Sequence, residues 1–148
     1  RGRGAQGGAN RSGKGAASVI GVGSVAQGGW GGEYLSAVEH VVGQQAGMLS
    51  SAIAPEDDRA LKQDEICKAA DAVDTGAGVV IVTDMFGGSP SNLSLRACSP
   101  ENRRILYGAN LPMLIKLAKS RKMAVPDAVD AALDAAHKYI NSHSVGQP

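Results

Sequence analysis

The stretch that decides the fold is VVIVTDMFGGSPSN, residues 79–92. Its opening Val-Val-Ile-Val run is apolar and β-branched without polar alternation, which is typical of a strand that helices cover on both faces of a parallel sheet. The chain then changes character, because a carboxylate, a glycine pair and a Ser-Pro helix start follow in close succession. The segment therefore predicts a buried strand, a loop and a helix start, in that order.

The loop after this strand has the composition of an anion-binding turn. Asp84 lies at the carboxyl end of the strand, the edge at which open α/β sheets bind ligands. Gly87 and Gly88 permit backbone angles that let consecutive N–H groups converge on an anion. Ser89 is a favourable N-cap and Pro90 a favourable first helical residue, so unpaired N–H groups face the same place. We therefore predict a phosphoryl-binding loop; the plainer alternative is an ordinary strand-to-helix turn with a capping aspartate.

Strand-like and helix-like segments alternate along the rest of the chain. Such alternation is typical of parallel strands joined by helical crossovers. We therefore expect an α/β fold, a mostly parallel open sheet with helices on both faces. The expected strands are 19–26, 47–53, 78–83 and 103–108, and the expected helices are 32–42, 58–74, 90–98, 111–120 and 126–141.

Length and composition favour one compact domain. The chain has 148 residues, of which 43% are hydrophobic and 3% aromatic, and it carries enough Val, Ile, Leu and Ala to fill a helix-covered sheet. Residues 1–18 are rich in Gly, Ala and Ser with scattered Arg and Lys. We expect a disordered basic extension over 1–18 and a single domain over 19–148.

Charge and cysteine content argue against several functions. The formal net charge of +1 includes the basic extension, which lacks the aromatic residues that stack on bases, so we expect no nucleic-acid partner. Cys67 and Cys98 are far apart and lack metal-ligand spacing, which favours unpaired thiols in a reducing cytoplasm. We expect neither a metal nor a cofactor. The sequence has no secretory or membrane-spanning segment, so we expect no direct membrane insertion.

Several separated motifs resemble one protein family. Residues 83–92, followed by GANLPML at 108–114, are similar to the enzyme IIA domain of the mannose family of the bacterial phosphoenolpyruvate:sugar phosphotransferase system. The resemblance covers roughly residues 19–141. Further motifs occur in the order and spacing of that family: EHVVG at 39–43, PEDD at 55–58 and VDTG at 73–76.

The resemblance implies a function and partners. Members of this family accept a phosphoryl group from the phosphocarrier HPr on a histidine and pass it to a IIB domain, which phosphorylates sugar at a membrane transporter. They are cytoplasmic and form homodimers. An aspartate orients the histidine and loop donors hold the phosphoryl oxygens; the residues that match these roles are Asp84 for the first and Gly87, Gly88 and Ser89 for the second.

The acceptor position departs from the family pattern. The family histidine follows the first strand, and counting back from Glu39 places Gln27 at its position. A carboxamide nitrogen shares its lone pair with the carbonyl group, whereas an imidazole nitrogen is a good nucleophile near neutral pH. The sequence therefore predicts a chain that cannot be phosphorylated at position 27, although the backbone donors of the loop can still bind phosphate.

The sequence around Gln27 is also unusual. Gly23 and Ser24 interrupt the expected buried strand, and GWGG at 29–32 replaces the family's helix start. Glycine inside a helix or strand costs about 0.5–1 kcal/mol relative to alanine, so we expect a weakened first strand and helix. Three explanations fit, and the sequence does not choose among them: a diverged pseudo-carrier, a deliberate alteration, or an incorrect reading of residues 1–32.

The remaining charged and titratable residues are expected to be structural or solvated. His40, His137 and His143 are not placed by pattern next to Asp84, so a surface or capping role is the default for each. The helix at 58–74 is expected to expose Lys62, Asp64, Lys68 and Asp71. A basic cluster near the 111–120 helix, normally a solvated face but a possible docking surface, contains Lys116, Lys119, Arg121 and Lys122.

Two other functions stay open beside the phosphocarrier. One is a non-catalytic regulatory module of the same fold that binds anions or phosphorylated partners through residues 87–91. The other is the phosphotransfer subunit of dihydroxyacetone kinase, which we rank last because its motif after the third strand differs from FGGSPSN.

Overall fold

A computed structural model of the chain describes residues 19–84 and 102–146. The expected extension at 1–18, the expected helix at 90–98, and Cys98 lie outside the described residues. No helix in the two described ranges is long and apolar enough to cross a membrane.

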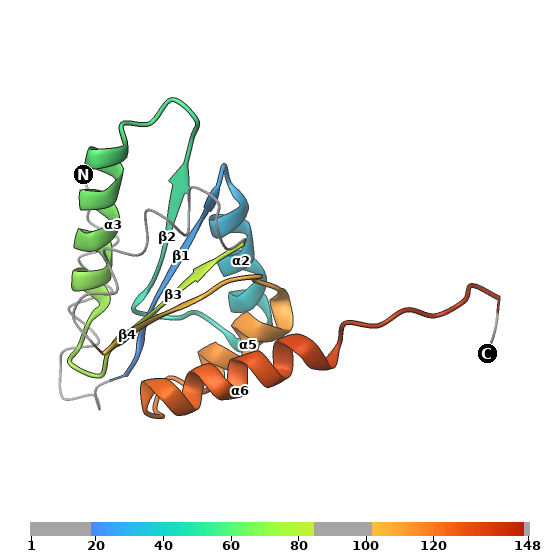
Figure 1. Cartoon of the computed structure of the whole chain (residues 1–148). Helices are drawn as coiled ribbons and strands as arrows, with labels where there is room; N and C mark the ends of the chain where they lie inside the picture. Colours follow the sequence, from blue (N-terminus) through green and yellow to red (C-terminus); the bar gives the residue numbers. More distant parts are fainter. Residues whose placement is uncertain (1–18, 85–101, 147–148) are drawn as a thin grey trace.

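The described residues form a parallel sheet of four strands in the order β2-β1-β3-β4, so the predicted α/β fold is confirmed. The first strand in the sequence lies in the middle of the sheet, between β2 and β3 (Figure 1). The strands are β1 (Gly21–Gln27), β2 (Met48–Ile53), β3 (Val79–Thr83) and β4 (Arg103–Leu106), and the helices are α2 (Trp30–Val42), α3 (Arg59–Val73), α5 (Leu111–Lys119) and α6 (Val125–Lys138).

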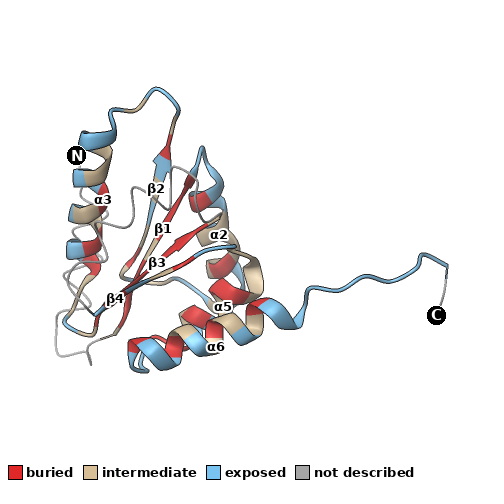
Figure 2. Ribbon diagram, in the orientation of Figure 1, coloured by how far each residue is buried: buried red, intermediate tan, exposed pale blue. Residues whose placement is uncertain are grey.

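Helices cover both faces of the sheet. Helix α3 lies on one face, and α2, α5 and α6 lie on the other (Figure 1). Buried residues follow β1, β3 and the inner sides of the helices (Figure 2). They form two apolar clusters, one on each face, because alternate residues of a strand point in opposite directions. Val80 and Val82 pack in the cluster that includes α5 and α6, whereas Val79 and Ile81 pack in the cluster that includes α3.

The first strand and helix form despite their glycines. Strand β1 runs through Gly23 and Ser24, and α2 begins at Trp30, earlier than the expected residue 32. Gly31 is buried, and a Cβ atom there would lie 3.2 Å from the Ser24 hydroxyl oxygen and 3.4 Å from Ser50 Cβ. The start of α2 therefore packs closely on the sheet, and this packing outweighs the low helix propensity of glycine.

Other predicted boundaries are wrong by a few residues at the carboxyl ends of elements. Strand β4 ends at Leu106, before the expected residue 108, and α6 ends at Lys138, before the expected residue 141. The chain after α6 is exposed and extends away from the body of the molecule (Figure 1). Apolar Ile140 and Val145 in that segment are exposed, so apolar residues alone did not extend the helix.

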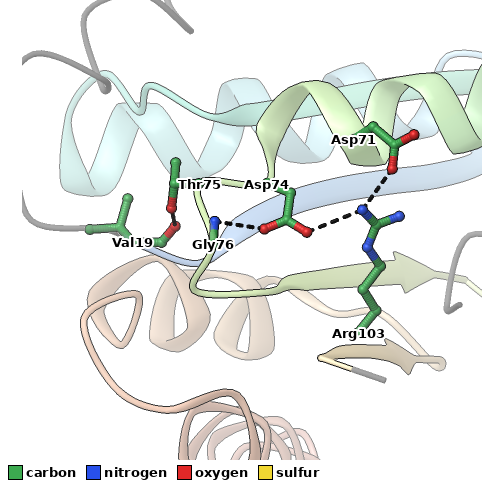
Figure 3. Close-up of polar contacts among 6 residues, drawn as sticks. All are labelled: Val19, Asp71, Asp74, Thr75, Gly76 and Arg103. Atoms are coloured by element: carbon green, nitrogen blue, oxygen red, sulfur yellow. Dashed lines mark hydrogen bonds and ion pairs between the residues drawn. The ribbon is translucent and has the colours of Figure 1, made fainter. Parts of the chain in front are cut away.

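Polar contacts fasten the amino-terminal edge of the sheet (Figure 3). Arg103 Nη2 lies 2.7 Å from Asp71 Oδ1 and 3.1 Å from Asp74 Oδ2. Asp74 also accepts a 2.9 Å hydrogen bond from the backbone N–H of Gly76, and the Thr75 hydroxyl donates a 2.7 Å bond to the carbonyl oxygen of Val19. The segment before β3 is thereby tied to β1 and β4, and Asp71 binds an arginine where only solvent was expected.

Arg121 is buried, so its expected place in a solvated basic cluster is wrong. Its guanidinium group donates hydrogen bonds to the carbonyl oxygens of Ile20 at 2.6 Å, Ala46 at 2.6 Å and Gly47 at 3.3 Å. Burial lowers the pKa of the Arg121 guanidinium below its ordinary value. Arg121 therefore joins the chain segments that lead into β1 and β2, at the edge of the sheet opposite to the predicted site.

Candidate functional site

The carboxyl edge of the sheet has the topology of a ligand-binding edge. The chain passes from β1 to β2 on one side of the sheet and then returns to β3 on the other side. Connections diverge at such a point and leave a crevice above the strand ends. Gln27 ends β1, and Asp84 directly follows β3, in which Thr83 pairs with Val25 of β1. The two residues therefore lie at the carboxyl ends of neighbouring strands.

Gln27 is exposed at the turn between β1 and α2. The turn is sharp because Gly28 has a φ of 58°, a conformation that glycine adopts without strain. The backbone N–H of Gly28 donates a 3.1 Å hydrogen bond to the carbonyl oxygen of Ile53, the last residue of β2. The position of Gln27 is thus fixed by the strand ladder before it and by a hydrogen bond directly after it.

A cavity of about 370 Å³ lies beside Gln27, between the ends of β1 and β2 and the start of α3. We call it the Gln27–Arg59 cavity. Gln27 belongs by strand alternation to the same face of the sheet as Val25, which packs in the apolar cluster of α3. The cavity is lined by Gln27, Gly28, Ile53, Ala54, Pro55, Asp57, Arg59 and Lys62.

The wall of this cavity is well ordered by local hydrogen bonds. Asp57 accepts a 2.7 Å bond from the backbone N–H of Ala54, and Asp58 caps α3 by accepting a 3.1 Å bond from the N–H of Leu61. Lys62 lies 2.9 Å from Glu65 and 3.7 Å from Asp57, and its side chain is only 15% exposed. The hydrogen bond with Glu65 raises the pKa of Lys62 above its ordinary value, against the opposing effect of burial, so Lys62 stays charged.

The Asp84 side of the edge is braced by α2 and by the segment before α5. The backbone N–H of Ala109 donates a 3.1 Å hydrogen bond to the carbonyl oxygen of Thr83, and the Tyr34 hydroxyl donates a 3.3 Å bond to the carbonyl oxygen of Ala109. Asn110 then caps α5 by accepting a 3.0 Å bond from the N–H of Met113. The motif at 108–114 thus fixes the end of β3, from which half-buried Asp84 emerges.

The Thr83 hydroxyl oxygen is buried and has no hydrogen-bond partner among the residues that the structure describes. A buried hydroxyl without a partner costs free energy, and such groups are uncommon in folded proteins. Thr83 lies directly before Asp84, at the carboxyl edge of the sheet. Sequence reasoning did not single it out, because a threonine that ends an apolar strand is ordinary.

The predicted site residues are placed only in part. Gln27 lines the cavity described above, whereas Asp84 is not among the residues that line it. Gly87, Gly88 and Ser89 lie outside the described residues, so the predicted phosphoryl-binding loop stays a prediction. The histidines His40, His137 and His143 are exposed, and none of them lines this cavity.

Sequence reasoning missed Arg59 and Lys62 as neighbours of Gln27. Lys62 was assigned to solvent because of its place in the helical pattern, but it is turned toward the cavity and paired with two acids. The signal that could have found it is the PEDD loop, whose acids fix the start of α3 next to the end of β1. Within the described ranges, no three His, Cys, Asp or Glu side chains gather so that they could hold a metal ion.

Several solved structures that share this fold are phosphotransferase-system proteins. Component EIIA from Streptococcus agalactiae is 25% identical, with a TM-score of 0.70 over 83% of this chain and 96% of that one. The IIA protein associated with the fucose utilization operon of Streptococcus pneumoniae is 24% identical, with a TM-score of 0.70 over 80% and 93%. The mannose/sorbose-specific IIA subunit from Enterococcus faecalis is 20% identical, with a TM-score of 0.73 over 87% and 98%. The last two show the likeness of fold alone.

A comparison with curated proteins gives no match. A family model, EIIA-man, described as the PTS system fructose IIA component, matches residues 28–136. The match begins directly after Gln27 and includes the motifs at 39–43, 55–58, 73–76 and 108–114 on which the resemblance rested. The chain therefore belongs to the EIIA-man family, the mannose-family IIA components of the phosphotransferase system.

Proposed function

We propose that this chain acts at the step between HPr and a IIB domain, as a IIA component that engages these partners but does not carry the phosphoryl group itself. The observation that carries the proposal is the place of Gln27, at the end of the central strand and beside the strand that leads into Asp84. In the proposed assignment this is the position of the family's acceptor histidine.

The chemistry at this position decides between carrying and binding. A histidine there would use one ring nitrogen to attack phosphorus in line, while Asp84 would accept a hydrogen bond from the other and fix the tautomer. Gln27 can donate and accept hydrogen bonds, but its nitrogen is not nucleophilic. The proposed roles of Gly87, Gly88 and Ser89, to hold phosphoryl oxygens, use backbone donors and the Ser89 hydroxyl. Those roles do not depend on residue 27.

The proposal includes a cytoplasmic location and a homodimer, both carried over from the family. HPr and IIB domains act on the cytoplasmic side of the transporter, so a partner of both must be found there. The dimer is tested by the concentration dependence of the molecular mass in solution, because a monomer at all accessible concentrations would remove it from the proposal.

The test is a relay reconstituted with phosphoenolpyruvate, enzyme I and HPr. We expect this chain to form a complex with HPr and with a IIB domain while it gains no acid-labile phosphate. An acid-labile phosphoprotein formed by this chain would contradict the assignment of Gln27, and the modified peptide would identify the true acceptor. Absence of binding to both partners would contradict the proposed step.

A second candidate is a regulatory module that binds phosphorylated partners or anions outside the relay. It is favoured by one observation, namely that the N-cap of α2 is Gly29, which supplies no side-chain cap and leaves N–H donors at the edge where Gln27 lies. Affinity capture separates the two functions. Retention of HPr and IIB favours the relay step, whereas retention of neither, with binding of phosphate, favours the regulatory module.

A further inference from the structure

We propose that the Gln27–Arg59 cavity is an oxyanion subsite, in which Arg59 and the Gln27 carboxamide hold a phosphoryl group without reacting with it. The inference deepens the proposed function and rests on it only for the source of that group. All residues that line the cavity lie within the described range 19–84, so the subsite is separate from the predicted loop at Gly87 to Ser89.

Arg59 is the cation of the cavity that is available to a ligand. It is exposed, and no ion pair of Arg59 occurs in the ranges 19–84 and 102–146. Lys62, by contrast, is held by Glu65 and Asp57. The planar guanidinium group matches the oxygens of a phosphoryl group with two parallel N–H donors, which a compact ammonium group cannot do.

Asp57, the acid in the cavity wall, does not cancel the attraction of Arg59 for a phosphoryl group. The Asp57 carboxylate accepts the N–H of Ala54 at 2.7 Å and lies 3.7 Å from Lys62, so its charge is already matched by donors of the wall. The same contacts order the loop between β2 and α3 before a ligand arrives. A preordered wall lowers the entropic cost of binding.

Gln27 can contact a phosphoryl group in the cavity without reacting with it. Its amide group can donate to an oxyanion, and its position is fixed by β1 and by the 3.1 Å bond from Gly28 to Ile53. The cavity of about 370 Å³ is much larger than the ~30 Å³ that a water molecule occupies, so it accepts an oxyanion together with the side chain that carries it. Apolar Ile53 and Pro55 in the lining suit that carrying group.

Two sources can supply a phosphoryl group, free phosphate or a phosphorylated side chain of a partner, and the experiment distinguishes them. Inorganic phosphate is titrated into the ¹⁵N-labelled protein at constant ionic strength, with chloride as the reference salt. We expect saturable shifts of the Arg59 Nε–H and Gln27 amide signals. Absence of these shifts, or equal shifts in chloride, overturns the proposal.

Variants then assign the contact to Arg59. Arg59→Gln is expected to weaken phosphate binding about tenfold, the loss of one charge-assisted contact, and Arg59→Lys about threefold. Lys122→Gln, which removes an exposed cation outside the cavity, is expected to leave binding unchanged. Unchanged binding in Arg59→Gln, with a native circular dichroism spectrum, overturns the proposal.

The affinity of HPr and of phosphorylated HPr for each variant identifies the source. If Arg59→Gln lowers only the preference for the phosphorylated form, the subsite receives a partner's phosphoryl group. If that preference is unchanged while phosphate binding is lost, the subsite receives free phosphate. If HPr does not bind in either form, the proposed relay step fails, and the phosphate titration still decides whether the subsite exists.

Discussion

Arg121 Nε lies 2.6 Å from the carbonyl oxygen of Ile20, although 101 positions separate the two residues in the sequence. The contact joins the loop between α5 and α6 to the residue that leads into the central strand. It is reinforced in the opposite direction, because the backbone N–H of Ile20 donates a 2.9 Å bond to the carbonyl oxygen of Arg121. Arg121 therefore helps to hold the edge opposite to the candidate site, together with the Arg103 contacts at the same edge.

Replacement of Arg121 by methionine should destabilise the whole domain. The substitution leaves the buried carbonyl oxygens of Ile20 and Ala46 without their donor, and we expect the free energy of unfolding to fall by about 2–4 kcal/mol. Urea unfolding followed by circular dichroism measures this. The exposed neighbour Lys122→Met is the control, and an equal loss in both variants would show that the buried contacts are not the cause.

Asp74 should make the domain sensitive to acid. Burial opposes its ionisation, but the hydrogen bond from Gly76 and the pairing with Arg103 outweigh burial and hold the pKa of Asp74 below its ordinary value. Such a carboxylate stabilises the fold fully above its unfolded-state pKa of about 3.9, and the stabilisation is lost as the pH falls through the folded-state pKa.

The measurement is the urea midpoint of wild type and Asp74→Asn between neutral pH and about pH 3. Wild type should lose more stability on acidification than Asp74→Asn, whereas Asp130→Asn, an exposed control, should follow wild type. Parallel curves for wild type and Asp74→Asn would refute the linkage.

Gly31 and Gly32 should respond oppositely to alanine. A Cβ atom at Gly31 would lie 3.2 Å from the Ser24 hydroxyl oxygen and 3.3 Å from its carbonyl oxygen, whereas at Gly32 the nearest atom is the Ser50 hydroxyl oxygen at 3.9 Å. Gly32→Ala should therefore stabilise the domain by about 0.5–1 kcal/mol through helix propensity, and Gly31→Ala should destabilise it by about 1 kcal/mol through crowding. Thermal unfolding compares the pair, and stabilisation by both would show that α2 can move away from β1.

Gln27→His should create a phosphate acceptor. If position 27 is the acceptor position, the new imidazole has the nucleophilic nitrogen that the carboxamide lacks, and acid-labile phosphate should appear on this chain in the reconstituted relay. Gln27→Asn should stay unlabelled. Asp84→Asn added to Gln27→His should slow labelling by at least about tenfold, because the orienting acceptor is lost.

One result would count against the register that places Gln27 at the acceptor position. A Gln27→His chain that binds HPr and remains unlabelled, with a native fold, has its histidine in the wrong place. If Asp84→Asn does not change the rate at which the Gln27→His chain is labelled, the histidine is still the acceptor, but Asp84 does not orient it.

The architecture was predictable from the sequence, while the contacts of individual charges were not. The Val79–Val82 run, with no polar alternation, specified a covered parallel strand, and the strand is buried on both faces. Helix propensity alone gave the wrong start for α2 at residues 29–32. Glycine is unfavourable in a helix, but at Gly31 only a residue without a side chain fits against Ser24 and Ser50 without crowding. The burial of Arg121 depends on carbonyl groups from distant segments, and a local pattern cannot contain that information.

The sequence was sufficient to predict that Gln27 and Asp84 lie at the same edge of the sheet. The order of motifs placed Gln27 and Asp84 after strands, and the sheet brings those strand ends together. The cavity with Arg59 depends on how the loop between β2 and α3 folds on Asp57, which is a matter of three-dimensional geometry.

Strand β1 is paired with a strand on each side, so the backbone of residue 27 keeps the same position whatever side chain it carries. Histidine and glutamine codons differ in their third base alone. If position 27 is the acceptor position, a single base change therefore converts a phosphate-accepting chain into one that cannot accept phosphate there, and a single base change reverses it.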